Sequence, residues 1–330
     1  MSKTKVAING FGRIGRMFLR SALKRGNFEI VAINDLTDSH TLAHLFKYDS
    51  IHGRFDGTLS STPTSLIING KEIKITAEKD PLQLPWKSMG VDIVIESTGR
   101  FTDEEGAGKH ITAGARKVII SAPAKGSMKT IVLGVNDSIL VGDEKIISNA
   151  SCTTNNAAPM LKILDDLWGV KIAFITTIHA YTGDQSLHDA PHKDLRRARA
   201  AAVSIIPTTT GAAKAMVDIF PHLDGKIGGA GIRVPVSDGS LTDLTCTLVK
   251  TPTVKEINAA FKTASETTMK GILEYTEDPI VSVDIVGNTN SCIFDSELTT
   301  VVGEMVKVVG WYDNEIGYSN RLVDLIAKID

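Results

Sequence analysis

The chain has 330 residues, about twice the usual length of one domain, so we expect two domains. Hydrophobic residues make up 42% of the chain and charged residues 22%, a composition typical of a globular protein and not of a disordered or collagen-like chain. The 36 Lys and Arg residues nearly balance the 38 Asp and Glu residues, and the formal net charge is −2. This balance argues against nucleic acid or an anionic membrane as a partner.

The sequence also bears on the location of the protein. The first ten residues contain one short apolar run, Val-Ala-Ile, which is too short for the core of a signal peptide. Nowhere is there an apolar run of about eighteen residues that could span a membrane. The cysteines Cys152, Cys246 and Cys292 are odd in number and far apart, as is typical of a reducing compartment. We therefore expect a soluble, cytoplasmic protein whose cysteines act as thiols.

The N-terminal segment predicts one βαβ unit. Residues 5–9 are a short apolar run that indicates a buried strand, and 13–25 carry apolar side chains at helical spacing. Gly26 is the predicted stop of this helix. A second buried strand at 28–33 completes the unit.

Between the first strand and the helix lies Gly10-x-Gly12-x-x-Gly15, the pattern of a dinucleotide-binding turn in its proper context. Gly10 permits a tight turn, Gly12 lets a pyrophosphate approach the backbone, and Gly15 lets helix and strand pack closely. Asp35 follows the second strand, where its carboxylate would bind a ribose 2′-hydroxyl and repel a 2′-phosphate. The pattern predicts NAD rather than NADP as the cofactor, and the alternative is a turn with no ligand.

Further strands at 91–96 and 117–120, with a helix at 103–115 between them, continue a parallel sheet. Residues 1–150 therefore read as one doubly wound, cofactor-binding domain.

After Cys152 strands outnumber helices, which favours an α+β domain at 151–314 on a mostly antiparallel or mixed sheet. The predicted strands are 170–178, 226–236, 241–249 and 298–309, and the predicted helices are 153–168, 210–219 and 253–269. A final helix within 315–330 should pack back on the first domain.

Two side chains of the second domain are candidates for catalysis. Cys152 directly precedes a helical pattern, and a thiol at a helix N-terminus has a stabilised thiolate. His179 ends a predicted strand just before a loop, where catalytic groups are often presented. Together they could form an activated thiol–imidazole pair. The alternatives are a buried, inert cysteine and a structural histidine.

Three features of the second domain indicate phosphate binding. The stretch 192–199 is basic, 207–214 places hydroxyls and a glycine before a helix, and Arg233 stands in an apolar run where it needs an anionic partner. A solvated charged face is the alternative for the basic stretch. The sequence contains no Walker A loop, Gly-x-Ser-x-Gly or His-Glu-x-x-His motif, and we expect no metal.

Several longer motifs, found in order along nearly the whole chain, closely resemble the phosphorylating glyceraldehyde-3-phosphate dehydrogenases. They are Asn9-Gly-Phe-Gly-Arg-Ile-Gly-Arg16, Ser151-Cys-Thr-Thr-Asn155, His179-Ala-Tyr-Thr182, Asp194-Leu-Arg-Arg-Ala-Arg-Ala-Ala201, Pro207-Thr-Thr-Thr-Gly-Ala-Ala-Lys214 and Trp311-Tyr-Asp-Asn-Glu315. The resemblance implies an α/β protein with a Rossmann-type parallel-sheet NAD domain and an α+β catalytic domain. It also implies a homotetramer that converts glyceraldehyde 3-phosphate, NAD and inorganic phosphate to 1,3-bisphosphoglycerate in glycolysis.

The resemblance assigns roles to residues that match the family motifs. Cys152 is the nucleophile and His179 its base. The dinucleotide contacts include Arg13, Ile14 and Asp35, and Asn314 holds the nicotinamide carboxamide. The substrate's phosphate site comprises Thr182 and Arg233, with Asp184 supporting the arginine. The inorganic-phosphate site comprises Ser151, Thr153, Arg197, Thr210 and Gly211.

Some positions depart from the family pattern. Asn156 replaces a usual second cysteine, which removes an oxidative cross-link, and Ile316 replaces a usual tryptophan. Ala190-Pro191 and Lys79 also differ from strictly NAD-dependent members, which leaves some NADP use open, whereas Asp35 argues against it.

Three alternatives to the main interpretation remain. The nearest is an erythrose-4-phosphate dehydrogenase, which typically lacks the Thr-Thr-Thr-Gly segment found here. The others are an NAD-binding redox sensor and a cysteine hydrolase.

Overall fold

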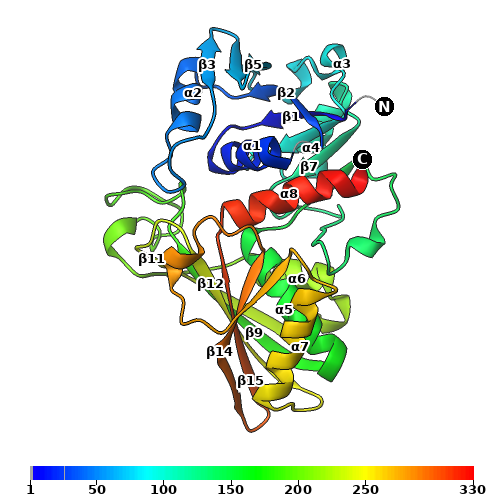
Figure 1. Ribbon diagram of the computed structural model, residues 1–330, viewed down its shortest axis with the longest axis vertical. Helices are drawn as coiled ribbons and strands as arrows, with labels where there is room; N and C mark the ends of the chain where they lie inside the picture. The colour runs from blue at the N-terminus through cyan, green and yellow to red at the C-terminus, as the bar shows by residue number, and fades with distance from the viewer. Residues whose placement is uncertain (1–2, 26) are drawn as a thin grey trace. The chain divides into compact units, whose positions relative to one another are not determined.

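The computed structural model describes residues 3–25 and 27–330, and the chain divides into two compact units (Figure 1). The first unit contains the residues up to Ile131 together with Ser138–Ala150 and Ser319–Asp330. The second contains Val132–Asp137 and Ser151–Tyr318. Gly26, the predicted helix stop, lies outside the described residues.

The first unit is built on one sheet with the strand order β3-β4-β5-β2-β1-β6-β7-β8. The strands from β5 to β8 in this order pair in parallel, as the βαβ pattern predicts. The strands are β1 (Lys5–Asn9), β2 (Glu29–Asn34), β3 (Leu59–Thr62), β4 (Ser65–Ile68), β5 (Lys71–Thr76), β6 (Ile93–Glu96), β7 (Lys117–Ile120) and β8 (Ile146–Ser148). The helices are α1 (Arg13–Arg25), α2 (Ser39–Lys47), α3 (Trp86–Met89), α4 (Glu104–Thr112) and the part of α8 (Ile316–Ile329) from Ser319 onward.

The antiparallel extension of this sheet, β3 to β5, is absent from the predicted elements. The strand β3 alternates between half-buried and exposed side chains, β5 mixes buried and exposed ones, and β4, although largely buried, has only four residues. One local signal was present: Asn69 and Gly70, both with positive φ, turn β4 into β5. An Asn-Gly pair between two apolar runs is the strongest short-range hairpin signal.

The second unit is also built on a single sheet, with the strand order β10-β11-β9-β12-β15-β14-β13. The sheet is mixed and mainly antiparallel, with parallel pairs at β11–β9 and β13–β14. The strands are β9 (Val170–Ala180), β10 (Ile206–Thr208), β11 (Ile227–Val234), β12 (Ser240–Leu248), β13 (Leu273–Thr276), β14 (Cys292–Val302) and β15 (Met305–Tyr312). The helices are α5 (Cys152–Trp168), α6 (Ala212–Ile219) and α7 (Val254–Glu266).

The predicted single strand at 298–309 is wrong. The chain reverses at Gly303, whose φ of 58° suits a tight turn, and the segment divides between the antiparallel strands β14 and β15. The apolar pattern continues on both sides of this turn, so hydrophobicity alone does not mark it.

One face of the second unit's sheet is covered by α5, α6 and α7 (Figure 1). Along β9, Ala173 and Ile175 are buried whereas Ile172 and Phe174, which point to the opposite face, are exposed. The same alternation continues across the sheet and leaves large apolar side chains exposed on the uncovered face. They are Ile172, Phe174, Leu298, Val302 and Met305.

The two sheets confirm the predicted α/β class, with a parallel-rich sheet in one unit and a mixed sheet in the other. Within the described part of the chain, no helix is both long and apolar enough to cross a membrane.

Candidate active site

Cys152 is the first residue of α5. Ser151 caps this helix, and its hydroxyl accepts a hydrogen bond from the N–H of Thr154 at 3.1 Å. The free N–H groups of the first turn and the helix dipole both favour negative charge at the Cys152 sulfur. The predicted placement of this thiol at a helix start is therefore found in the structure.

The fold brings Cys152 and His179 together. The Cys152 Sγ lies 3.4 Å from His179 Nε2. Because β9 and β11 pair in parallel with His179 opposite Arg233, the arginine lies on the other side of the imidazole. Arg233 Nη1 is 2.6 Å from His179 Nδ1 and donates to the carbonyl of Ala180 at 2.8 Å.

The imidazole has two polar neighbours at Nδ1. They are the Ala180 carbonyl oxygen, which can only accept, at 2.7 Å and Arg233 Nη1, which can only donate, at 2.6 Å. In the neutral tautomer that donates to Ala180, the proton is on Nδ1 and the lone pair of Nε2 faces the sulfur of Cys152. This is the arrangement that a base needs to receive a proton from a thiol or from a group bound to it.

Burial and the positive charge of Arg233 shift the pKa values of His179 and Cys152. They lower the pKa of His179 to about 3, so the imidazole is neutral at pH 7. Burial raises the pKa of the Cys152 thiol, whereas the charge of Arg233 and the hydrogen bonds of Thr153 act in the opposite direction. Without other ligands the pair is therefore a neutral imidazole beside a thiol whose ionisation depends on Arg233.

Tyr312 is a neighbour of this pair that sequence reasoning did not single out. Its ring and the His179 ring form a T-shaped pair with centroids 5.9 Å apart. Its hydroxyl hydrogen-bonds the hydroxyls of Thr153 at 2.9 Å and Thr177 at 2.8 Å. The only sequence signal was its place beside Asn314 in a conspicuous polar segment.

A second polar cluster surrounds Arg197. This arginine forms an ion pair with Asp184 at 2.6 Å, and its Nε donates to the Thr208 hydroxyl at 2.9 Å. The Thr182 hydroxyl donates to the other oxygen of Asp184. Asp184, expected to support Arg233, thus contacts Arg197 and acts on Arg233 only through its charge. An arginine beside threonine hydroxyls offers the donors that phosphate oxygens accept from.

The other predicted phosphate residues have contacts of their own. Gly211 is the N-cap of α6, and the hydroxyl of Thr210 accepts from the N–H of Ala212 at 3.2 Å. Thr153 is buried with its hydroxyl against Tyr312, and Ser151 caps α5.

The first unit contains a cavity of about 350 Å³ at the glycine turn. It is lined by Asn9, Gly10, Gly12, Asn34, Asp35, Leu36, Glu78, Lys79, Ser97, Thr98, Arg100 and Phe101. Asp35 accepts hydrogen bonds from the N–H groups of Phe11 at 2.8 Å and Thr37 at 3.0 Å, which fix its carboxylate at the cavity.

The glycines of the turn test whether this cavity fits a dinucleotide. A Cβ on Gly15 would lie 2.2 Å from the Gly10 carbonyl oxygen, and one on Gly10, whose φ is 95°, would lie 2.8 Å from the backbone of Ser97. A Cβ on Gly12 would meet no atom within 4 Å. Packing therefore requires Gly10 and Gly15, whereas Gly12 leaves open space where a pyrophosphate could approach the backbone.

The remaining predicted cofactor residues have defined contacts. Arg13, in the first turn of α1, forms an ion pair with Asp49 at 2.5 Å. Ile14 follows it on the same helix. Asn314, in the second unit, is buried and its side-chain oxygen accepts from the Ser240 hydroxyl at 2.7 Å.

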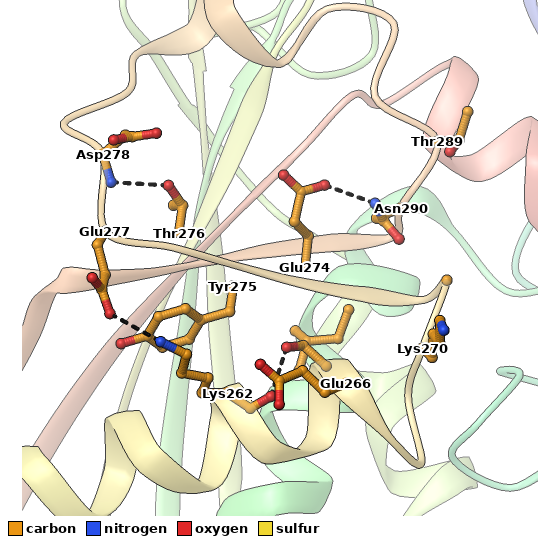
Figure 2. A pocket seen from close by; sticks show the side chains of 13 residues that line it. Lys262, Glu266, Lys270, Glu274, Tyr275, Thr276, Glu277, Asp278, Thr289 and Asn290 are labelled. Carbon is orange, nitrogen blue, oxygen red and sulfur yellow. Dashed lines mark hydrogen bonds and ion pairs between the residues drawn. The ribbon is translucent and has the colours of Figure 1, made fainter.

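A larger cavity of about 770 Å³ lies beside β13 and α7 (Figure 2). Its described lining residues include no cysteine or histidine. Figure 2 shows Lys262 paired with Glu277 at 3.5 Å and the Asn290 amide donating to Glu274 at 2.8 Å. Without a thiol or an imidazole among these residues, this cavity is not a candidate for thiol–imidazole chemistry.

Comparison with protein families gives two matches. Residues 4–104 match the model "Glyceraldehyde 3-phosphate dehydrogenase, NAD binding domain". Residues 151–314 match "Glyceraldehyde 3-phosphate dehydrogenase, C-terminal domain".

Full-length relatives agree with the family matches. The glyceraldehyde-3-phosphate dehydrogenase of Geobacillus stearothermophilus is 58% identical over 327 residues, covering 98% of each chain. Glyceraldehyde-3-phosphate dehydrogenase 1 of Bacillus cereus is 55% identical over 326 residues, and the Streptomyces coelicolor enzyme is 57% identical over 329 residues, each with 98% coverage of both chains.

Proposed function

The chain belongs to the glyceraldehyde-3-phosphate dehydrogenase family, and from that premise we propose that it oxidises glyceraldehyde 3-phosphate with NAD and inorganic phosphate. The products are 1,3-bisphosphoglycerate and NADH, formed through a thioester on Cys152. The observation that carries this proposal is the Cys152–His179 pair, with 3.4 Å between sulfur and nitrogen, at the start of a helix and beside Arg233.

In the proposed first half-reaction, the Cys152 sulfur adds to the aldehyde carbon and the thiol proton passes to the new hydroxyl group. His179 Nε2 then takes that hydroxyl proton as the hydride leaves the same carbon, and the thioester remains. NAD, when bound, supplies the nicotinamide that accepts the hydride. The helix N-terminus stabilises negative charge that develops on the oxygen.

In the second half-reaction, an oxygen of inorganic phosphate attacks the thioester carbonyl, the carbon–sulfur bond breaks, and the Cys152 thiolate is restored. Arg233 with Thr182, and Arg197 with Thr210, supply positive charge and hydroxyl donors for the two phosphate groups. Water attack in place of phosphate would give a free acid, so a filled phosphate site also protects the acyl group.

The residues of the first unit fit NAD as the cofactor. Gly12 leaves its backbone open to a pyrophosphate, and the carboxylate of Asp35 lies at the cavity where it would bind a ribose 2′-hydroxyl. Lys79 also lines this cavity and would attract a 2′-phosphate. We expect the charge of Asp35 to prevail, because Asp35 is held by two backbone N–H groups.

Absorbance at the NADH band tests the proposal. Purified protein with glyceraldehyde 3-phosphate should form NADH rapidly with NAD and phosphate or arsenate, and slowly with NADP. Cys152→Ser should abolish turnover, and Cys246→Ser is the matched control. Equal turnover without the oxyanion would contradict the phosphorylating reaction and favour hydrolysis or an erythrose-4-phosphate substrate. No NADH under any condition would leave only a redox sensor.

We also propose that the protein forms a homotetramer. The uncovered face of the second unit's sheet supports association with a second copy of the chain, because the strand register sets the exposed side chains of Ile172, Met305 and Val302 in one row with Thr247. Light scattering measures the assembly, and Ile172→Asp with Met305→Asp should reduce it. A monomer in the unmodified protein would refute the tetramer.

A further inference from the structure

A chain of buried polar side chains runs beneath the cofactor cavity of the first unit and has no part in the chemistry described above. It leads from Trp86 through His110 and Glu96 to Asn9 and Asn34, and all of these side chains are buried. Its hydrogen bonds join positions 14 to 87 residues apart in the sequence. Buried polar groups cost stability unless they are fully paired, so a network of this length calls for a reason.

The hydrogen bonds fix the tautomer of His110. The indole N–H of Trp86, which can only donate, lies 3.0 Å from His110 Nδ1. Nδ1 is therefore the acceptor, and the neutral ring carries its proton on Nε2, which lies 3.0 Å from Glu96 Oε2. Trp86 is itself part of the apolar core of this unit, so it anchors the far end of the network.

Glu96 is surrounded by donors. Its Oε2 accepts from His110 Nε2 and from the Asn9 side-chain amide at 2.5 Å. Its Oε1 accepts from the Thr98 N–H at 2.8 Å and from the Thr98 hydroxyl. Only a carboxylate, which has acceptors on both oxygens, satisfies all of these donors.

From Asn9 the network continues to the other side of the cavity. The Asn9 oxygen accepts from the Asn34 amide at 2.7 Å. The Asn34 side chain in turn accepts from the N–H of Glu78 at 2.8 Å and donates to its carbonyl at 2.9 Å. Glu96 thus holds Thr98 on one wall of the cavity directly and Glu78 on another through two asparagines, and both residues line the cavity.

We propose that Glu96, oriented by His110, is a positioning residue for NAD. Its carboxylate sets the spacing of the two walls that receive the nucleoside whose ribose meets Asp35, so the site is formed before the cofactor arrives. Preorganisation of this kind contributes affinity by lowering the ordering cost of binding. The inference rests on the proposed use of NAD and concerns residues that would touch the cofactor only through their neighbours.

Glu96→Gln tests this role with little change of shape. A glutamine offers one oxygen and one NH₂ group. Its NH₂ group would face the donors that one Glu96 oxygen now accepts from, so the hydrogen bonds to that part of the cavity wall would be lost. We expect the Kd for NAD, from isothermal titration, to rise at least tenfold. The Kd for ADP-ribose, which carries the same nucleoside and pyrophosphate, should rise by the same factor. The KM for NAD should rise likewise, whereas kcat at saturating NAD should stay within twofold.

Two variants of His110 distinguish a role in positioning Glu96 from a role in stability alone. His110→Gln keeps an N–H donor near the Nε2 position and should bind NAD within about threefold of the unmodified protein. His110→Leu removes that donor and should bind at least tenfold more weakly. If the buried variants fail to fold, Thr98 at the partly exposed end of the network allows the same comparison. Thr98→Ser keeps the hydroxyl that donates to Glu96, whereas Thr98→Val removes it.

Melting of the ligand-free proteins completes the test. NAD affinity within twofold of the unmodified protein in Glu96→Gln, with or without a lower Tm, would overturn the proposal and leave a structural role. An equal loss of affinity in His110→Gln and His110→Leu would overturn the role of the donor. The proposed function fails differently, because the unmodified protein itself would then bind no NAD.

Discussion

The charge of Arg233 should control how readily Cys152 ionises, and this can be measured without substrate. The contacts from Arg233 to His179 and from His179 to Cys152, with the width of the imidazole, place the guanidinium at most about 8 Å from the sulfur. Two unit charges at that separation interact by about 2 kcal/mol at an effective dielectric constant of about 20. This corresponds to about thirtyfold in the ionised fraction of the thiol at a fixed pH. Solvent at the partly exposed Cys152 screens the interaction, and we expect about tenfold.

The assay is alkylation of Cys152 by iodoacetamide, a neutral reagent that does not use the phosphate sites. Arg233→Gln should slow the reaction about tenfold at pH 7, whereas Arg233→Lys, which keeps the charge, should stay within about threefold. Removing Arg233 also makes His179 easier to protonate, so the comparison is made in a His179→Asn background. Peptide mass analysis shows which cysteine is alkylated. Cys246 and Cys292 are buried and should not compete with Cys152.

An unchanged alkylation rate in Arg233→Gln, with Tm preserved, would refute this reasoning. It would mean that the helix N-terminus alone sets the ionisation of the thiol.

Four further outcomes follow from the geometry. Gly10→Ala should cost about 2 kcal/mol or more of unfolding free energy because of its positive φ and backbone clash, whereas Gly12→Ala should melt normally and lose NAD affinity; melting and titration check both. Tyr312→Phe removes a hydroxyl that bridges two threonine hydroxyls and should cost about 1 kcal/mol in denaturant unfolding. Burial opposes ionisation of Asp49, but hydrogen bonds from Arg13 and backbone N–H groups outweigh it and lower its pKa to about 2 from 3.8. Ionised Asp49 should therefore contribute about 2 kcal/mol to the unfolding free energy at pH values above 3.8, and this contribution should be lost as the pH falls through about 2. Asp49→Asn should lack this pH-dependent contribution. Asp35→Ala should lower kcat/KM with NAD and raise it with NADP.

The parts of the fold that the sequence predicts well are those with strong local signals. The βαβ unit is marked by an apolar run, a glycine turn and a helical period, each within about ten residues. The strands β3 and β5 carry mixed patterns, and β4 is only four residues long. The turn at Gly303 interrupts no apolar period, so the two strands that it joins are merged in the prediction. The spacing of apolar residues reflects which side chains are buried, so it is a weaker signal for strands that are only partly buried.

The candidate site divides in the same way. Cys152 and His179 could be singled out one by one, because each stands at the end of a regular element. Their contact with Arg233 depends on the pairing of β9 with β11, which are more than forty residues apart in the chain. The partners of Glu96 depend likewise on which strands become neighbours. A sequence pattern carries no direct record of such pairings, so these residues become recognisable only in the fold.

The position of Arg233 also suggests why substrate binding and catalysis belong together. Its charge favours an anion on Cys152 and disfavours a cation on His179, so in the absence of phosphate it prepares the nucleophile and weakens the base. A phosphate dianion on Arg233 would cancel that charge and reverse both effects. In the proposed reaction the aldehyde and its phosphate arrive together, so the thiolate forms in the free protein, whereas the imidazole accepts a proton only once the phosphate is in place. One arginine can therefore serve both steps, because the substrate itself changes the charge that the pair experiences.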